Sequence, residues 1–152
     1  MALDKQTEMT MAETDDLLAS HETGVLSMAQ DDEPYAIPIS YGYDAEGRRF
    51  YMRLVSTPDS EKRRFLSSSP RVRLVVYDEA DGRYRSAVAV GPLEEIEPAA
   101  LTVEDIEQYG DTKRPLFEIW GESKRNLDIR LYQLAPTELS GRRIDLDRET
   151  GE

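Results

Sequence analysis

The chain has 152 residues, of which 39% are hydrophobic and 33% charged, so we expect one charge-rich globular domain. Its formal net charge of −12 argues against a nucleic-acid-binding protein, in which a basic patch dominates. The absence of cysteine excludes disulfides, thiol catalysis and cysteine-ligated metals.

The composition also bears on localisation. No apolar run approaches the roughly 18 residues of a membrane span, and the acidic start does not resemble a signal peptide. We therefore expect a cytoplasmic protein without a membrane partner. Only four of the 19 basic residues are lysines. An acidic, arginine-rich surface fits a halophilic organism with a salty cytoplasm, and an ordinary acidic cytosolic protein is the alternative.

The first half of the chain predicts one helix and three strands. Residues 1–12 lack periodicity and are expected to form a flexible N-terminus. A short helix should follow, capped by Thr10 or Thr14 and ended by Gly24. The strands are predicted over residues 25–29, 35–43 and 48–55, with turns between them.

Pro38 lies within the second of these strands. Because proline has no N–H group to donate, its strand needs a free or irregular edge at that point. The residue is therefore either an edge device or a place where backbone groups serve a ligand.

The second half begins with a helix expected over residues 58–68, with Thr57 as cap and Pro58 at its first position. The Asp81-Gly82 pair is typical of a hairpin turn. Further strands are predicted over residues 71–77, 84–96 and 127–132, and helical or irregular pieces over 98–110 and 115–121.

These elements predict a mainly β (α+β) fold. Six strands at hairpin spacing, with short helices between them, indicate a closed or nearly closed antiparallel barrel. The domain is expected to span residues 13–140, with an acidic C-terminal tail over 141–152.

The chain carries little chemistry of its own. His21 is its single histidine, which leaves no histidine cluster for a metal, and we interpret it as a structural residue at a helix end. No nucleophile elbow, phosphate-binding loop or dinucleotide fingerprint is present. Acidic pairs such as Asp31-Asp32 are interpreted as turn and surface charges. No catalytic residue is assigned.

The start of the helix after Pro58 is unusual because it carries Lys62, Arg63 and Arg64. Cations near a helix N-terminus oppose the helix dipole, whereas a bound anion would reverse that cost. The segment therefore indicates either a phosphate site or a solvated basic surface. A barrel without a strong acid, base or nucleophile favours a bound cofactor. Flavin mononucleotide (FMN) would suit, with its phosphate at Ser60 and Lys62.

Several segments together resemble the pyridoxamine 5′-phosphate oxidase-like flavin-binding family. The similarity extends over about Glu22 to Glu97 and depends on the order and spacing of its parts. Those parts are residues 23–27, 34–41, 50–53, 60–62, 69–72 and 84–88.

The resemblance implies a six-stranded split barrel that forms a homodimer with FMN at the subunit interface. By position, it implies backbone contacts to the flavin ring from Ile37, Pro38, Ile39 and Ser40. It also places Tyr51, Met52 and Arg53 beside the ring or ribityl chain. Ser60 and Lys62 would bind the phosphate, and Arg85 and Ser86 would approach from the other subunit.

Two features depart from the family pattern. Glu61 stands where the family often has a basic residue, so Arg53, Arg63 or Arg64 would have to compensate for its charge. No histidine follows His21, so the late arginine/histidine substrate motif of true pyridoxamine-phosphate oxidases is missing.

The resemblance favours an FMN-dependent oxidoreductase of unknown substrate. The alternatives are a reductase that binds a deazaflavin coenzyme and a non-catalytic module that binds or stores flavin.

Overall fold

The computed structural model describes residues 6–56, 60–67, 70–96 and 128–146. Two helices and nine strands lie within them. Their order is β1 (Gln6–Glu8), α1 (Met11–Ala19), β2 (Thr23–Gln30), β3 (Glu33–Ser40), β4 (Gly42–Asp44), β5 (Arg49–Ser56), α2 (Glu61–Leu66), β6 (Arg71–Ala80), β7 (Arg83–Glu95), β8 (Asp128–Leu134) and β9 (Glu138–Asp145).

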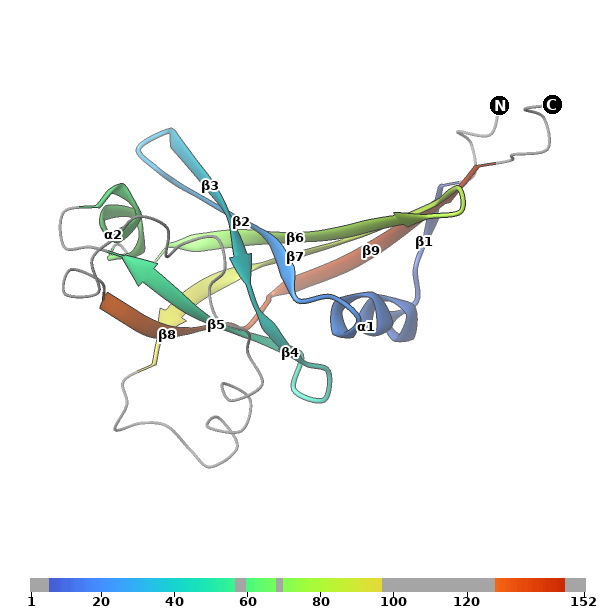
Figure 1. The fold of residues 1–152 in the computed structure, drawn as a ribbon, viewed down its shortest axis with the longest axis horizontal. Coiled ribbons are helices and arrows are strands. Elements are labelled where there is room, and N and C mark those ends of the chain that lie inside the picture. Colours follow the sequence, from blue (N-terminus) through green and yellow to red (C-terminus); the bar gives the residue numbers. More distant parts are fainter. Residues whose placement is uncertain (1–5, 57–59, 68–69, 97–127, 147–152) are drawn as a thin grey trace.

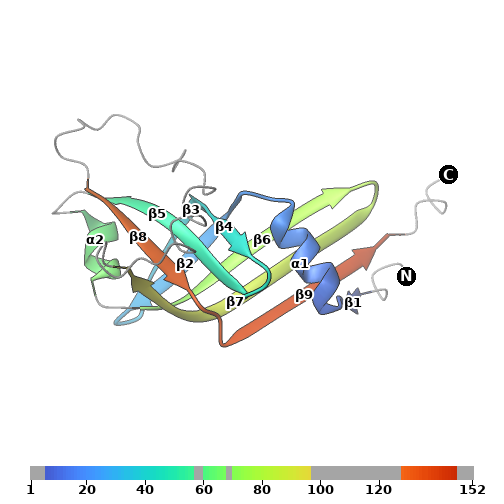
Figure 2. The same cartoon turned by 90° about the horizontal axis from the view of Figure 1, so that it is seen from below.

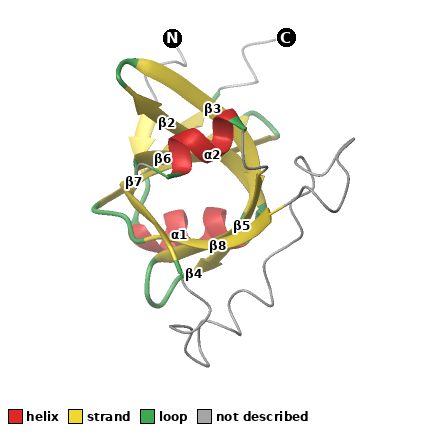
Figure 3. Cartoon of the chain, turned by 90° about the vertical axis from the view of Figure 1, so that its left-hand side faces the viewer, coloured by secondary structure: helices red, strands yellow, loops and turns green. Residues whose placement is uncertain are grey.

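All strand pairs are antiparallel, and the main path through the sheet is β3-β2-β6-β7-β8-β5-β4. β9 pairs with β7 and with β1 outside this path. Seen along its length, the sheet curls into a barrel, with α2 at the near end and α1 at the far end (Figure 3). The expected fold class is confirmed, although the nine observed strands exceed the expected six.

β7 holds the barrel together because it changes partners along its length. Residues Arg83–Val90 lie between β6 and β9, and Leu93–Glu95 pair with β8. The change occurs beside Gly91, where an added Cβ would lie 2.8 Å from the Ala135 carbonyl oxygen. A glycine is therefore needed where the connection between β8 and β9 crosses β7.

The barrel encloses one hydrophobic core. Alternate residues of each strand point inward, and the fully buried ones include Leu26, Phe50, Met52, Leu74 and Leu134. The long β6–β7 hairpin and β9 extend beyond the barrel, and α1 lies against one face of this extension (Figures 1 and 2). Neither of the two described helices lies on the opposite face of the extension.

The two ends of the domain differ from the expectation. β1 lies within the segment expected to be flexible, and it pairs with the part of β9 assigned to the acidic tail. The Met9 N–H donates a 2.8 Å hydrogen bond to the Gly141 carbonyl. The first described strand thus begins at Gln6, and the last ends at Asp145.

The helix ends also required correction. α1 is capped by Thr10, whose hydroxyl accepts from the Glu13 N–H, so one of the two predicted caps is confirmed. Gly24 does not end this helix, which stops at Ala19; Gly24 lies inside β2. A Cβ there would approach the Val75 carbonyl oxygen to 2.8 Å, so close strand packing explains the glycine.

α2 is shorter than predicted. It begins at Glu61 because the Ser60 hydroxyl accepts a 3.1 Å hydrogen bond from the Arg63 N–H, so Ser60 is the cap instead of Thr57. The helical pieces predicted over residues 98–110 and 115–121 lie outside the described residues. No helix in the described part of the chain is long and apolar enough to cross a membrane.

Candidate functional site

The first part of the candidate site is the end of β3, where the sequence predicted backbone contacts to a ring. Among the described strands β3 pairs only with β2, so its second edge has no strand partner. Pro38 lies opposite Val25 in this pair, and its side chain is exposed. An edge strand tolerates the missing N–H of Pro38, as the sequence indicated.

Ile39 and Ser40 are both buried but point to opposite faces of β3. Ile39 belongs to the hydrophobic core. The Ser40 side chain is 1% exposed, and its hydroxyl finds no hydrogen-bond partner among the described residues. A buried hydroxyl without a partner costs about 1–3 kcal/mol. The Ser40 hydroxyl is therefore a buried polar group at the end of β3 that could accept or donate a hydrogen bond to a ligand.

β5 carries the second part of the site. Its Met52 side chain is fully buried in the core, so only the Met52 backbone is available to a ligand. Tyr51 and Arg53 point to the other face, with Tyr51 buried and Arg53 half-buried. They pair with Gln133 and Leu131 of β8. β3 and β5 lie side by side although they do not pair.

α2 follows β5 and carries the predicted phosphate ligands. The Ser60 hydroxyl accepts from the Arg63 N–H as a cap, which leaves its proton free to donate. Lys62 is half-buried in the first turn. Glu61 is exposed and lies 3.9 Å from Arg64. Because the helix has only six residues, Arg63 and Arg64 lie in its last turn, where cations favour the dipole.

Aromatic and ionic contacts hold α2 against the β2–β3 hairpin. The rings of Tyr35 and Phe65 stack at 4.9 Å, and the Arg64 guanidinium lies 4.7 Å from the Phe65 ring centre. Arg64 also donates to Gln30 and Glu33, each at 3.3 Å. β3 thus contacts α2 at its hairpin end and lies beside β5, the strand that leads into α2. We call the candidate residues of these three elements the β3–β5–α2 site.

Arg85 and Ser86 lie elsewhere, on β7 near α1. Arg85 makes a bidentate ion pair with Asp78, with Nε 3.0 Å from Oδ1, and a longer pair of 3.6 Å with Asp16 of α1. His21 adds a 2.8 Å contact to the same Asp78 carboxylate. These contacts fasten the end of α1 to the β6–β7 hairpin.

The same contacts perturb the titration of both partners. The Arg85 hydrogen bonds hold the pKa of Asp78 below its ordinary value, with a smaller contribution from His21. The Asp78 carboxylate in turn raises the pKa of Arg85. Ser86 projects from the opposite face of β7, where it pairs with Tyr77 and Arg142. Within one chain, the structure therefore does not bring Arg85 and Ser86 into the β3–β5–α2 site.

Sequence reasoning did not find the ion cluster around Asp78. Asp16 lies in α1, His21 in the connection after it and Arg85 in β7, so no local pattern joins all three to Asp78. The alternation of side chains along the strand predicts only that Asp78 points to the face opposite Tyr77 and Glu79, and it does not name the partners of Asp78.

The family model described as "Pyridoxamine 5'-phosphate oxidase" matches residues 10–143. The chain belongs to the pyridoxamine 5′-phosphate oxidase family. The match covers both helices and eight of the nine described strands at least in part. It includes every residue of the β3–β5–α2 site. No curated protein matches the sequence.

Solved structures show the same family fold. A FAD-binding protein from Mesorhizobium loti is 22% identical, with a TM-score of 0.70 over 91% of this chain and 97% of its own. A FAD-binding protein from Mycobacterium smegmatis is 17% identical, with a TM-score of 0.66 over 93% of this chain and all of its own.

A third structure, from Corynebacterium glutamicum, is provisionally assigned as a pyridoxamine 5′-phosphate oxidase. It is 20% identical, with a TM-score of 0.68 over 94% of this chain and 96% of its own. At these identities the likeness shows the split-barrel fold of the family.

Proposed function

We propose that the protein binds a flavin in the β3–β5–α2 site and acts as a flavin-dependent oxidoreductase of the cytoplasm. The observation that carries the proposal is Ser40, whose buried hydroxyl lacks a partner among the described residues. Buried polar groups in folded proteins are nearly always hydrogen-bonded. A bound polar ligand beside the free edge of β3 would supply the missing partner.

The residues present fit a flavin phosphate. Lys62 supplies a positive charge, and the Ser60 hydroxyl keeps a donor after capping α2. The negative charge of Glu61 is turned toward Arg64, which offsets its effect on an anion nearby. Arg53, half-buried on the neighbouring strand, is the further cation that the family resemblance places close to the cofactor.

When bound, a flavin supplies hydride transfer, and the protein supplies binding and orientation. The edge of β3 from Ile37 to Ser40 offers backbone groups to a planar ring, and the exposed Pro38 ring provides an apolar surface there. The side chain of Tyr51 is buried on the outer side of β5 and is not part of the hydrophobic core.

FMN is our first choice of cofactor because the site offers one cluster of phosphate-binding groups. Two structural neighbours are named as FAD-binding proteins, which makes FAD the specific competitor. A deazaflavin coenzyme and a storage module without turnover remain the other readings of the same site.

We further propose a homodimer in which Ser86 of a second copy completes the site. Ser86 lies on the face of β7 opposite α1, and the neighbouring Arg85, on the α1 face, is paired with Asp78. Ser86 can therefore reach a flavin only across an interface. In this arrangement Arg85 supports the strand instead of contacting the ring directly.

The test is to purify the protein, record its absorbance spectrum and weigh the copurifying small molecule by mass spectrometry. We expect flavin absorbance and the mass of FMN. Lys62→Ala should weaken FMN binding about tenfold to a hundredfold because a charge-assisted contact of about 1.5–3 kcal/mol is lost. Arg83→Ala is the matched control, since it removes a cation that pairs with Asp145 away from the site.

The outcomes separate the alternatives. A copurifying mass of FAD or of a deazaflavin would replace FMN as the cofactor. Bound flavin that no nicotinamide donor reduces would support the storage reading. Equal FMN affinity in the Lys62→Ala variant and the wild type would show that the phosphate assignment is wrong.

A further inference from the structure

Two large aromatic side chains are exposed on the extension formed by β6, β7 and β9. Tyr77 is 69% exposed and Tyr84 is 43% exposed, and the described part of the chain exposes no other large hydrophobic side chain to this degree. Within the described residues, neither phenol hydroxyl forms a hydrogen bond. Tyrosine is enriched where proteins contact one another, because its ring is apolar and its hydroxyl is polar. The two side chains therefore indicate a contact that this chain does not make by itself.

The strand register places both tyrosines on the face of the extension opposite α1. Asp78 follows Tyr77 on β6 and points to the α1 face, where it belongs to the ion cluster described above. Because side chains alternate along a strand, Tyr77 points to the other face. Tyr77 lies opposite Ser86 of β7, so these two side chains are direct neighbours there. Tyr84 shares the face but lies opposite Glu79, one row nearer the hairpin turn.

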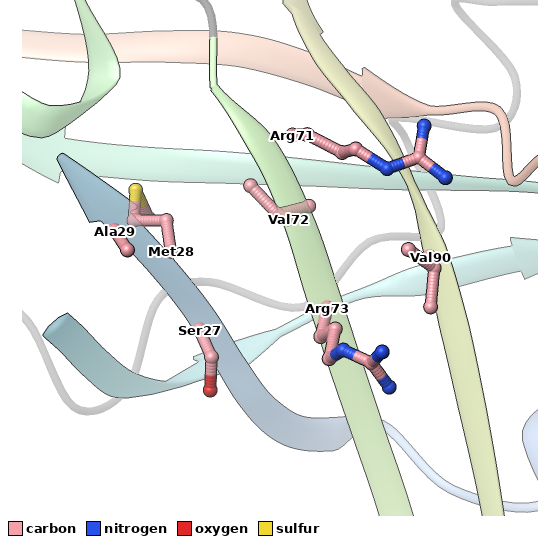
Figure 4. A pocket seen from close by; sticks show the side chains of 7 residues that line it. All are labelled: Ser27, Met28, Ala29, Arg71, Val72, Arg73 and Val90. Atoms are coloured by element: carbon pink, nitrogen blue, oxygen red, sulfur yellow. The ribbon is translucent and has the colours of Figure 1, made fainter. Parts of the chain in front are cut away.

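Apolar side chains continue this face toward the barrel. Val75 and Val88 lie opposite each other in the next row, and both are half-buried. Figure 4 shows the row after that, where Val90 of β7 lies beside Arg73 of β6. Contiguous apolar surface of this kind marks an interaction site. The face therefore suits the homodimer contact proposed above.

The position of Tyr77 beside Ser86 has a consequence in that dimer, which brings Ser86 of one copy to the flavin of the other. Directly opposite residues of an antiparallel pair have Cβ atoms about 4.5–5.5 Å apart. A tyrosine side chain is several ångströms longer than a serine side chain, so the Tyr77 ring projects beyond the Ser86 hydroxyl. A planar group that is hydrogen-bonded to Ser86 therefore lies within reach of the Tyr77 ring.

The chemistry of Tyr77 suits the flavin ring better than the flavin phosphate. Its side chain is planar and uncharged, and aromatic rings attract one another when they pack offset or edge to face. The groups that fit the phosphate, Ser60 and Lys62, lie at the start of α2. One copy thus offers the phosphate-binding groups, and the second copy offers an aromatic ring.

We propose that the Tyr77 side chain of one copy packs against the flavin ring bound in the β3–β5–α2 site of the other copy. Tyr77 is then a cofactor-binding residue supplied across the dimer interface. This inference rests on the proposed function and adds to it the residue that covers the ring. Neither copy holds the flavin ring fully by itself.

Equilibrium dialysis of the purified full-length protein against FMN or riboflavin measures the affinity and the number of flavins bound per dimer. Tyr77→Leu should weaken both ligands about tenfold, because it removes an aromatic contact with the ring that they share. Tyr77→Phe should bind both within about twofold of the wild type, since the ring is kept. Lys62→Ala should weaken FMN alone, because riboflavin has no phosphate.

Tyr84→Leu is the matched control, because it removes the second exposed tyrosine from the same face without touching the row of Ser86. It should leave the affinities for FMN and riboflavin unchanged. Sedimentation velocity at the concentrations used for dialysis shows which variants are dimeric. The control thus separates a contact with the flavin ring from a general effect on the interface.

A mixed dimer tests whether the contact crosses the interface. Copies that carry Lys62→Ala and Tyr77→Leu are given different affinity tags, produced together and purified through both tags. In the proposed arrangement, one site of this dimer receives both substitutions and the other receives neither. The mixed dimer should therefore bind one FMN with wild-type affinity, although neither variant does so alone. It gives this answer even if Tyr77→Leu dissociates by itself, because only one copy carries that substitution.

Two weakened sites in the mixed dimer would overturn the proposal, because they would mean that Tyr77 acts within its own chain. Riboflavin binding by Tyr77→Leu as tight as that of the wild type would overturn it too, as would equal effects of Tyr77→Leu and Tyr84→Leu. In these cases the wild type still binds FMN, and the proposed function stands. A wild-type protein that binds no flavin would contradict the proposed function, and this inference with it.

Discussion

At the scale of single residues, Ser40 and Thr14 are buried to the same extent but differ in hydrogen bonding. Both are buried, with 1% and 0% of their surface exposed. The Thr14 hydroxyl donates to the Thr10 carbonyl at 3.0 Å, whereas the Ser40 hydroxyl has no partner among the described residues. Thr14 is thus satisfied by its own helix, and Ser40 is the group that a ligand would satisfy.

Ser40→Ala should therefore have opposite effects on stability and on binding. The flavin-free variant should be as stable as the wild type or more stable, because a buried hydroxyl without a partner is removed. The stabilisation that added FMN gives should shrink by about 1 kcal/mol. Urea unfolding with and without FMN measures both effects.

Thr14→Val is the control for Ser40→Ala, since it removes a hydroxyl that is hydrogen-bonded and should destabilise the protein with and without flavin. A large loss of stability in flavin-free Ser40→Ala would contradict our interpretation, because it would mean that the hydroxyl has a partner in the fold itself.

At the scale of elements, α1 depends on a close approach to β9. Gly141 faces the helix there, and an added Cβ would collide with the Thr14 hydroxyl and come within 2.6 Å of the Met9 methyl group. The same region is tied by an ion pair between Arg143 and Glu13. The approach is possible because the β9 residue has no side chain.

Gly141→Ala should lower the free energy of unfolding by about 1–3 kcal/mol, since overpacking forces α1 away from the sheet. Chemical unfolding followed by circular dichroism measures the change. Gly47→Ala is the control: its added Cβ would meet only the end of the half-buried Asp44 side chain, with Oδ2 at 2.8 Å, and the end of this side chain can move. Equal effects of the two substitutions would rule out tight packing at Gly141 as the cause.

At the scale of the whole molecule, the excess of acidic residues sets the response to salt. With 31 acidic and 19 basic residues, repulsion between like charges opposes the folded state. Salt screens the repulsion between charges that are farther apart than the Debye length, which is about 10 Å at 0.1 M and about 3 Å at 1 M. The halophilic origin inferred from composition stays a prediction, and it has a direct consequence for stability.

The melting temperature should rise steadily as KCl is increased from about 0.05 M to about 1 M, a range over which screening becomes nearly complete. Differential scanning calorimetry measures it. Sucrose in place of KCl is the control, because it stabilises by exclusion from the surface without screening charge. A melting temperature that falls with KCl would mean that ion pairs such as Arg85–Asp78 outweigh the general repulsion.

The sequence by itself determined the class of fold and much of its order. Alternating residues and turn signals such as Asp81-Gly82 are local, so they predicted an antiparallel barrel with short helices. These local signals did not predict where the helices begin and end. Ser60 replaces Thr57 as the cap of α2 because several polar residues near a helix start can cap it, and one sequence does not choose among them.

Only the tertiary structure decided which residues meet. The curl of the sheet brings β3 beside β5, with which it does not pair. The fold leaves Ser40 without a hydrogen-bond partner among the described residues, and the register of β6 and β7 sets Arg85 opposite Asp78. The physical reason is that a strand carries its side chains to two faces, and only the neighbouring strands determine what each face contacts.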